Sequence, residues 1–326
     1  MKLSRLLLLA AALLPASAHA LPPQEAPPGP RVALIKMPYR GARNVEERSG
    51  GPDYLEAGGL ADTLRMAGWD LASMATVALT AEDEREYGEW HRLGLANGHL
   101  ADMVADNARD GVLSVGLLGN CASLMGMLGG LQHGGPIGEP RRVGLIYIDA
   151  HGDFNTPETT ASGFLDGMAL AAVVGRCWRD ETATVEGFRP LPEGRVALAG
   201  ARDLDSAEAE LLAGSEVSRI TAGEIRARGA GAAFGPALDA LAAAGAARVY
   251  LHLDLDVLDP GVARVNAFAA PGGLALADLT AAVAAIGARL PIAAAALTAY
   301  DPEVDADGAA LAAALAVLRA VATAAG

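Results

Sequence analysis

The sequence feature that most constrains the fold is a series of short, uninterrupted apolar runs that alternate with helix-like segments. The apolar runs are residues 31–37, 112–118, 143–148, 196–199, 249–255 and 292–297, and helical patterns occur at 55–66, 91–107 and 123–131. A strand that is apolar throughout must be covered on both faces, and helical crossovers between parallel strands provide that cover. We therefore expect an α/β fold, a three-layer α/β/α sandwich with a mainly parallel central sheet. Its ligand site should lie at the carboxyl ends of the strands.

The first thirty residues have a different character from this alternating pattern. Residues 1–20 combine a cationic start, a short apolar core and a small-residue site ending at Ala20, which is typical of a secretory signal peptide. Residues 21–30 are rich in proline and predict an extended leader. We expect cleavage after Ala20, a periplasmic or secreted protein without membrane insertion, and one folded domain over residues 31–326.

The net charge of the chain limits the classes of molecule that it is expected to bind. The formal net charge is −14 and would become −16 after loss of Lys2 and Arg5 with the signal peptide. Such a surface repels phosphate backbones and anionic lipids, so we expect no nucleic-acid partner and a small-molecule substrate. The two cysteines, Cys121 and Cys177, could pair in an oxidising compartment or be two small buried residues.

Polar residues follow the apolar run at 143–148. Asp149, His151 and Asp153 occupy alternate positions, so their side chains leave the strand end on one side of the chain. Two carboxylates and an imidazole suit a divalent ion such as Mn²⁺ or Zn²⁺. A polar turn after a strand is the simpler alternative for this segment alone.

A second apolar run carries Asp254 and Asp256. Two buried acids two residues apart repel each other and lose hydration unless a cation neutralises them. They are therefore hard to explain as core residues. Together, the two acid-bearing segments predict a metal site built from Asp149, His151, Asp153, Asp254 and Asp256.

These two segments, DAHGDFN at 149–155 and DLDVLDP at 254–260, resemble the metal-binding signatures of the arginase and agmatinase (ureohydrolase) superfamily. The resemblance extends over nearly the whole chain after the leader. Shorter matches are Gly51-Pro52, the segment 160–163, Arg202 to Asp205 with Glu208, and the segment 271–274. The resemblance implies an arginase/deacetylase-like fold.

The resemblance also implies a chemistry and a cofactor. In that family two Mn²⁺ ions share a hydroxide that attacks a guanidinium carbon, because the metals lower the pKa of water. By resemblance, Asp149, His151, Asp254 and Asp256 hold one ion, and Asp149, Asp153 and Asp254 with one histidine hold the other. We expect one or two divalent ions, Mn²⁺ first and Zn²⁺ as the alternative. Candidate substrate contacts are Asn155, Ser162 and Asp205.

The histidine of the second metal position is missing. The matching stretch reads Gly119-Asn120-Cys121-Ala122-Ser123, and we assign the ligand position to Ala122, which cannot bind metal. The thiolate of Cys121 is one replacement and would favour a softer ion such as zinc. His252, on the same strand as Asp254, and His133 are the other candidates, each with a structural role as the alternative.

The substrate side differs from the family pattern as well. The family's Asn and His after the Ser-Gly pair are replaced here by Phe164 and Asp166. Asp166 could act as an acid or base with Asp153 in catalysis, or it could cap the helix expected at 167–174. The guanidinium-binding glutamate position holds Ala299, and Asp301 or Glu303 could substitute.

These observations predict a metal-dependent hydrolase of a linear C–N bond in a guanidino, amidine or amide compound. The alternative is a relative that binds metal or a ligand without turnover. A deacetylase-like enzyme is a third possibility that rests on fold analogy alone. Family members commonly form homo-oligomers, so we also expect that arrangement.

Overall fold

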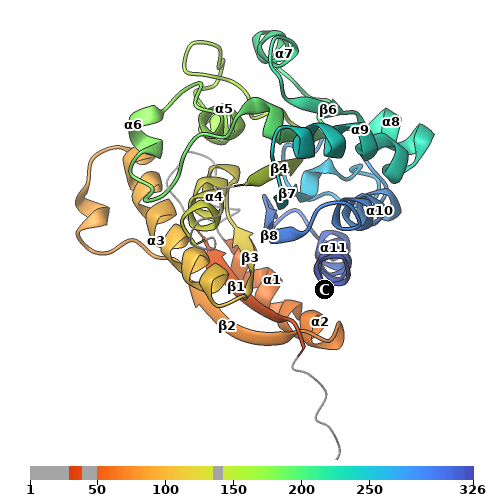
Figure 1. The fold of residues 1–326 in the computed structure, drawn as a ribbon, viewed down its shortest axis with the longest axis horizontal. Helices are drawn as coiled ribbons and strands as arrows, with labels where there is room; N and C mark the ends of the chain where they lie inside the picture. The colour runs from red at the N-terminus through yellow and green to blue at the C-terminus, as the bar shows by residue number, and fades with distance from the viewer. Residues whose placement is uncertain (1–28, 39–49, 135–141) are drawn as a thin grey trace, which may run out of the picture.

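The computed structural model describes residues 29–38, 50–134 and 142–326. The expected signal peptide and residues 21–28 of the leader lie outside the described residues. Eight strands form one sheet in the described part of the chain, in the order β2-β1-β3-β8-β7-β4-β5-β6, and all pairs are parallel (Figure 1). The strands are β1 (Arg31–Met37), β2 (Asp70–Thr76), β3 (Leu113–Leu118), β4 (Val143–Ile148), β5 (Val196–Ala199), β6 (Ser218–Ile220), β7 (Arg248–Asp254) and β8 (Ile292–Thr298).

Helices connect the strands and cover both faces of the sheet (Figure 1). The α-helices are α1 (Gly51–Ala57), α2 (Leu60–Met66), α3 (Glu89–Arg109), α4 (Leu124–His133), α5 (Ala169–Val173), α6 (Arg179–Thr182), α7 (Ser206–Ala213), α8 (Ala222–Arg228), α9 (Ala230–Ala243), α10 (Leu276–Gly287) and α11 (Ala309–Ala325). Short 3₁₀ turns are η2 (Asp83–Arg85), η3 (Cys121–Ser123), η4 (Asp166–Met168), η5 (Glu193–Arg195) and η6 (Leu255–Val257).

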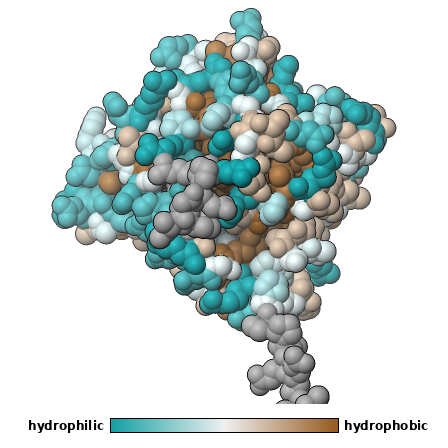
Figure 2. Space-filling view, viewed as in Figure 1, coloured by the Kyte–Doolittle hydropathy of each residue, from teal (hydrophilic) through white to brown (hydrophobic). Residues whose placement is uncertain are grey.

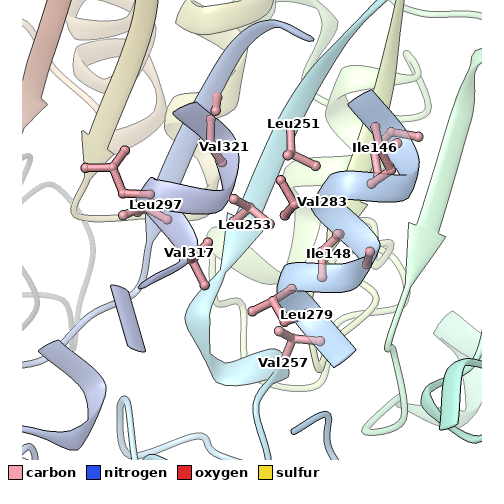
Figure 3. Close-up of a cluster of buried hydrophobic side chains, with 14 of the residues drawn as sticks. Ile146, Ile148, Leu251, Leu253, Val257, Leu279, Val283, Leu297, Val317 and Val321 are labelled. Carbon is pink, nitrogen blue, oxygen red and sulfur yellow. The ribbon is translucent and has the colours of Figure 1, made fainter. Parts of the chain in front are cut away.

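The hydrophobic core is divided by the sheet into two clusters. Along β4, Ile146 and Ile148 belong to one cluster, and Leu145 and Tyr147 belong to the other. This is the alternation that a strand covered on both faces requires. The first cluster packs strands β4, β7 and β8 against α10 and α11 (Figure 3). The second packs the opposite face against α3, α4 and α5. The predicted three-layer α/β/α sandwich with a parallel sheet is confirmed.

Two strands were not predicted from the sequence, and one predicted helix is divided. Strands β2 and β6 lie at the two edges of the sheet. The predicted helix at 55–66 is two helices in the structure, α1 and α2, because the chain turns at Gly58 and Gly59, where Gly59 has a φ of 98°. Such a φ is unfavourable for residues with a Cβ atom.

The distribution of hydrophilic residues on the surface is consistent with a fold whose apolar residues are mostly buried in these two cores. On the face shown in Figure 2, hydrophilic residues are spread over the surface and hydrophobic residues show mainly between them. Among the described residues, no helix combines the length and the apolar character needed to cross a bilayer.

Candidate metal centre and its cavity

The predicted metal ligands meet at the carboxyl ends of neighbouring strands. Cys121 follows β3, Asp254 ends β7, and Asp149 follows β4. Strand β8, which ends at Thr298, lies between β3 and β7 in the sheet. All three ligand candidates are buried. The parallel sheet therefore brings together side chains that are far apart in the sequence.

One group of possible ligands consists of Asp149, His151 and Asp256. One ligand atom of each lies within 4.8 Å of the others. The His151 Nδ1 atom is 3.2 Å from Asp149 Oδ1 and 3.4 Å from Asp256 Oδ2. Backbone amides hold the two carboxylates: the His151 N–H donates to Asp149 Oδ1, and the Ala150 N–H donates to Asp256 Oδ1.

A second group consists of Cys121, Asp149 and Asp254, again within 4.8 Å of one another. The Cys121 thiol donates to Asp254 Oδ2 at 3.2 Å, and the Thr298 hydroxyl donates to the same oxygen at 3.3 Å. The Asp256 backbone N–H donates to the other oxygen of Asp254. Asp149 belongs to both groups, so it can bridge two cation positions.

Asp153 lies in the same cavity but outside both groups. Its carboxylate accepts a hydrogen bond from the buried Tyr147 hydroxyl. Its backbone has a φ of 49°, a left-handed conformation that aspartate tolerates better than most residues with a side chain. Backbone strain of this kind is concentrated at functional sites.

The carboxylates surround a cavity of about 520 Å³. It is lined by Cys121, Asp149, His151, Asp153, Asn155, Thr160, Ser162, Phe164, Asp166, Gly167, Asp203, Asp205, Glu208, Asp254, Asp256, Ala267, Phe268 and Ala269. The lining thus includes the predicted metal ligands Asp149, His151, Asp153, Asp254 and Asp256, the predicted substrate contacts Asn155, Ser162 and Asp205, and Asp166. It includes eight acidic side chains and no lysine or arginine from the described residues.

The electrostatics of this acid cluster favour a cation. Burial, followed by the charge of Asp256, raises the pKa of Asp149 to about 6. Burial and neighbouring carboxylates also raise the pKa values of Asp153 and Asp254 well above their ordinary range. Burial alone would lower the pKa of His151, but the carboxylates of Asp149 and Asp256 raise it above its ordinary value.

Asp256 behaves in the opposite way to the other acids. Burial is the largest single effect and favours protonation, but the hydrogen bond and charge of His151, together with hydrogen bonds to Asn266 and Asp254, outweigh it and lower the pKa of Asp256 to about 2. A single imidazolium thus compensates one carboxylate and leaves the remaining acids without enough positive charge. The Asp149 Oδ2 atom is buried and has no hydrogen-bond partner among the described residues. A divalent cation fits this set of oxygen, nitrogen and sulfur donors.

The predicted substrate contacts Asn155, Ser162 and Asp205 also line the cavity. Asn155 donates from its amide to Asp205 Oδ2 at 3.1 Å. Asp205 is the N-cap residue of α7, and Glu208 closes a capping box there by accepting from the Asp205 N–H. The other Glu208 oxygen accepts from the Phe154 N–H, next to Asn155. Glu208 therefore ties the metal-binding segment after β4 to the loop that carries Asp205.

Two assignments from the sequence need correction. The structure places the thiol of Cys121 among the carboxylates, whereas Ala122, the next residue of η3, does not line the cavity. Asp166 does not cap the following helix, because the N-cap residue of α5 is Met168 and no side chain caps it. Instead, Asp166 lines the cavity and accepts a hydrogen bond from the Ala122 N–H at 3.4 Å.

The other proposed replacement ligands lie elsewhere. His252 is buried below Asp254, with its ring stacked on Tyr147 and its Nδ1 paired with the Tyr250 hydroxyl. Burial lowers the pKa of His252 to about 3, so this ring is neutral. His133 is exposed at the end of α4. Neither histidine lines the cavity.

Further expectations for the loops are also resolved. Ala299 is buried and does not line the cavity. Asp301 and Glu303 do not line the cavity either, so neither acid replaces the family's guanidinium-binding glutamate there. Cys121 and Cys177 are both buried, and both are free thiols.

Three residues of the site were missed from the sequence. Phe268 lines the cavity, and Asn266 donates from its amide to Asp256 Oδ2 at 3.1 Å. Both belong to an irregular loop that carries no periodic signal. Tyr147 was treated only as part of an apolar strand, although a tyrosine at the buried end of a strand normally needs a hydrogen-bond partner.

Comparisons with known proteins place this geometry in a family. The chain is 38% identical over 145 residues to the N(omega)-hydroxy-L-arginine amidinohydrolase of Streptomyces lavendulae, a match that spans 44% of this chain and 47% of that relative. It is 30% identical over 215 residues to the arginase of Brevibacillus brevis, covering 64% of this chain and 70% of the relative. The crystal structure of Bacillus subtilis arginase matches with a TM-score of 0.79 and 25% identity, over 89% of this chain and 98% of that one. Because the Arginase family model also matches residues 31–323, this chain belongs to the arginase family.

Proposed function

We propose that this protein is a metal-dependent hydrolase that cleaves a non-peptide C–N bond in a cationic guanidino or amidine compound. The observation that carries the proposal is the group of buried carboxylates around Asp149, with its unpaired Oδ2 atom, at the floor of an acid-lined cavity. The similarity to arginases and to a hydroxyarginine amidinohydrolase supports this chemistry over a non-catalytic role.

Two cation positions follow from the two groups of ligand atoms. Asp149, His151 and Asp256, with Asp254 added by resemblance to the family, would hold one ion, and Cys121, Asp149 and Asp254 with Asp153 nearby would hold the other. We expect Mn²⁺ at the first position. The sulfur of Cys121 favours Zn²⁺ at the second. When bound, a divalent ion lowers the pKa of water and thereby supplies a nucleophile at neutral pH.

The remaining residues of the cavity would bind and orient the substrate. Asn155, Ser162 and Asp205 present amide, hydroxyl and carboxylate groups from one wall, where they can fix the end of the substrate remote from the metals. Asp166 lies on the wall beside Cys121 and could hold a proton for the departing amine. The surplus of carboxylates in the cavity favours a positively charged substrate.

The test combines metal counting with turnover. The protein expressed without residues 1–20 is loaded with Mn²⁺ or Zn²⁺, and metal is counted by elemental analysis. Release of urea or ammonia is then measured from a panel of guanidino and amidine compounds. We expect Asp254→Ala to lose both metal and turnover. The control Asp102→Ala alters an exposed acid on α3 and should leave both unchanged.

Each alternative outcome has a defined meaning. Bound metal without turnover of any compound in the panel would favour a relative that binds metal without catalysis. A protein that binds no metal would overturn the proposal. Export to the periplasm remains part of the same proposal, and N-terminal sequencing of the mature protein tests the cleavage expected after Ala20.

A further inference from the structure

The mouth of the cavity differs in chemistry from its floor. The acids Asp149, Asp254 and Asp256 are buried at the floor, at the strand ends. Part of the outer lining is apolar, namely Phe164 and the segment Ala267, Phe268 and Ala269, and Phe268 is 43% exposed. The outer lining also contains the exposed polar residues Ser162, Asp203 and Asp205. A ligand that enters can therefore contact this apolar rim before it reaches a strongly acidic interior.

Two phenylalanines from different loops form the main part of this rim. Phe164 precedes η4, and Phe268 belongs to the loop between η6 and α10. Their ring centroids are 5.7 Å apart, and the ring planes are inclined by 24°, which is a stacked arrangement. Aromatic faces placed in this way provide apolar contact area for a ligand at little cost in conformational entropy, since each ring has only two rotatable side-chain bonds.

The loop that carries Phe268 is attached to the metal centre. The Phe268 N–H donates to Asn266 Oδ1 at 2.8 Å. The Asn266 amide donates in turn to Asp256 Oδ2 and to the Ala299 carbonyl, each at 3.1 Å. Just beyond Phe268, the Ala270 carbonyl accepts from Arg202, which also donates to the Asp256 carbonyl.

The loop that carries Phe164 is fixed by local hydrogen bonds. The Phe164 N–H donates to Ser162 Oγ at 3.1 Å, and the Gly163 N–H donates to the Thr160 hydroxyl at 3.1 Å. Ser162 is also one of the candidate substrate contacts. The two rings are thus held at a defined place relative to both the acids and the predicted substrate-binding wall.

We propose that Phe164 and Phe268 form an aromatic entrance that selects substrates with a cationic guanidinium or amidinium head and an apolar, aryl or alkyl, substituent. This inference rests on the proposed function, since it assumes that the head group binds over the acidic floor. The apolar substituent would then lie against the two rings. Selection arises because a substrate without that substituent leaves the rings in contact with water.

Binding measurements test the entrance without requiring turnover. The metal-loaded protein is titrated calorimetrically with two probes, 4-phenylbutylguanidine and n-butylguanidine, which share a head group and differ by one phenyl ring. We expect the wild type to bind the phenyl probe at least about tenfold more tightly, since apolar contacts of this size discriminate by that order. Phe164→Ala and Phe268→Ala should reduce this ratio to about threefold or less, and Phe268→Leu should retain part of it.

The controls separate the entrance from the function on which it rests. Tyr87→Ala removes an aromatic side chain that is 97% exposed and lies outside the cavity, so the ratio should stay at the wild-type value. Circular dichroism of each variant shows whether it is folded. If both probes bind and the ratio is equal in the wild type and the phenylalanine variants, the entrance is wrong while the proposed function survives. If neither probe binds to metal-loaded wild type, the entrance is overturned, and the proposed function is decided separately by metal counting and the turnover panel.

Discussion

Tyr147 occupies an unusual position at the residue scale. Its side chain is fully buried at the end of β4, its hydroxyl donates to Asp153, and its ring stacks on His252 with centroids 4.5 Å apart. A hydroxyl that holds a ligating carboxylate fixes the orientation of that carboxylate. Tyr147 therefore supports the cation position that involves Asp153.

We predict that Tyr147→Phe weakens metal binding by about 10- to 100-fold at one of two positions, because Asp153 loses the group that orients it. Chelator competition with metal counting measures the effect. Tyr250→Phe is the matched control, since Tyr250 is equally buried but donates no hydrogen bond to an acid of the site. Equal metal affinities in the two variants would contradict this role of Tyr147.

Cys121 supports a second prediction at this scale. Its sulfur belongs to the group with Asp149 and Asp254, and sulfur binds Zn²⁺ more strongly than Mn²⁺. Cys121→Ser should therefore lower Zn²⁺ affinity by about tenfold or more and change Mn²⁺ affinity less. Cys177→Ser alters a buried thiol outside the cavity and should change neither. An unchanged Zn²⁺ affinity in Cys121→Ser would mean that the sulfur is not a ligand.

At the scale of elements, the sequence predicted those strands that have a continuous apolar pattern. The central strands are apolar throughout, so their existence and the position of Asp149 and Asp254 at their ends could be foreseen. The edge strand β2 is mostly exposed, and β6 has only three residues, so neither carries a buried-strand pattern. The loop with Asn266 and Phe268 has no period at all, because its conformation depends on tertiary contacts with Asp256 and Arg202.

The contact between α3 and α4 depends on glycines spaced by four residues on α4. A Cβ atom on Gly130 would lie 2.5 Å from Val104 Cβ and 2.6 Å from the Ala101 carbonyl oxygen. One on Gly126 would lie 2.7 Å from the Asn97 carbonyl oxygen. The absence of side chains lets the two helix backbones approach closely. Since α4 follows Cys121 and η3, this contact also positions one side of the metal centre.

We predict that Gly130→Ala destabilises the fold by about 1–3 kcal/mol, because the added methyl group pushes against the backbone of α3. An alanine in an open helical position has the opposite effect, by up to about 1 kcal/mol. Gly231→Ala on α9 is the matched control, since a Cβ there meets nothing within 4 Å. Urea unfolding measures both variants. A Gly130→Ala protein as stable as the wild type would show that the helices can separate without cost.

At the scale of the whole molecule, the two hydrophobic cores stabilise the fold, whereas the buried acid cluster that they hold in place destabilises it when no cation is bound. The cores fix the ends of β3, β4, β7 and β8, and this brings buried carboxylates together whether or not a cation is bound. Without a cation, the cluster can remain buried only if some of its carboxyl groups keep their protons. The stability of the metal-free protein should therefore depend on pH.

The pKa of Asp149 determines whether the stability of the metal-free protein rises or falls with pH. This pKa is about 6 in the folded, metal-free protein, whereas an unfolded chain has the ordinary aspartate pKa of 3.8. Between these values the unfolded chain releases the proton and the folded protein keeps it, so stability falls as pH rises, by about 3 kcal/mol for this group. The raised pKa values of Asp153 and Asp254 act in the same direction. The lowered pKa of Asp256 contributes stability that is lost only as pH falls toward about 2.

Metal binding reverses this trend, since a cation binds the ionised carboxylates and must displace their protons. We predict that the melting temperatures of Mn²⁺-loaded and chelator-treated protein are close at pH 4.5 and separate progressively up to pH 7. Differential scanning calorimetry at several pH values measures the gap. Asp149→Asn has no proton to release at this position and a weaker ligand, so its gap should be small at every pH. A wild-type gap that is constant from pH 4.5 to 7 would mean that the buried acids do not form the cation site.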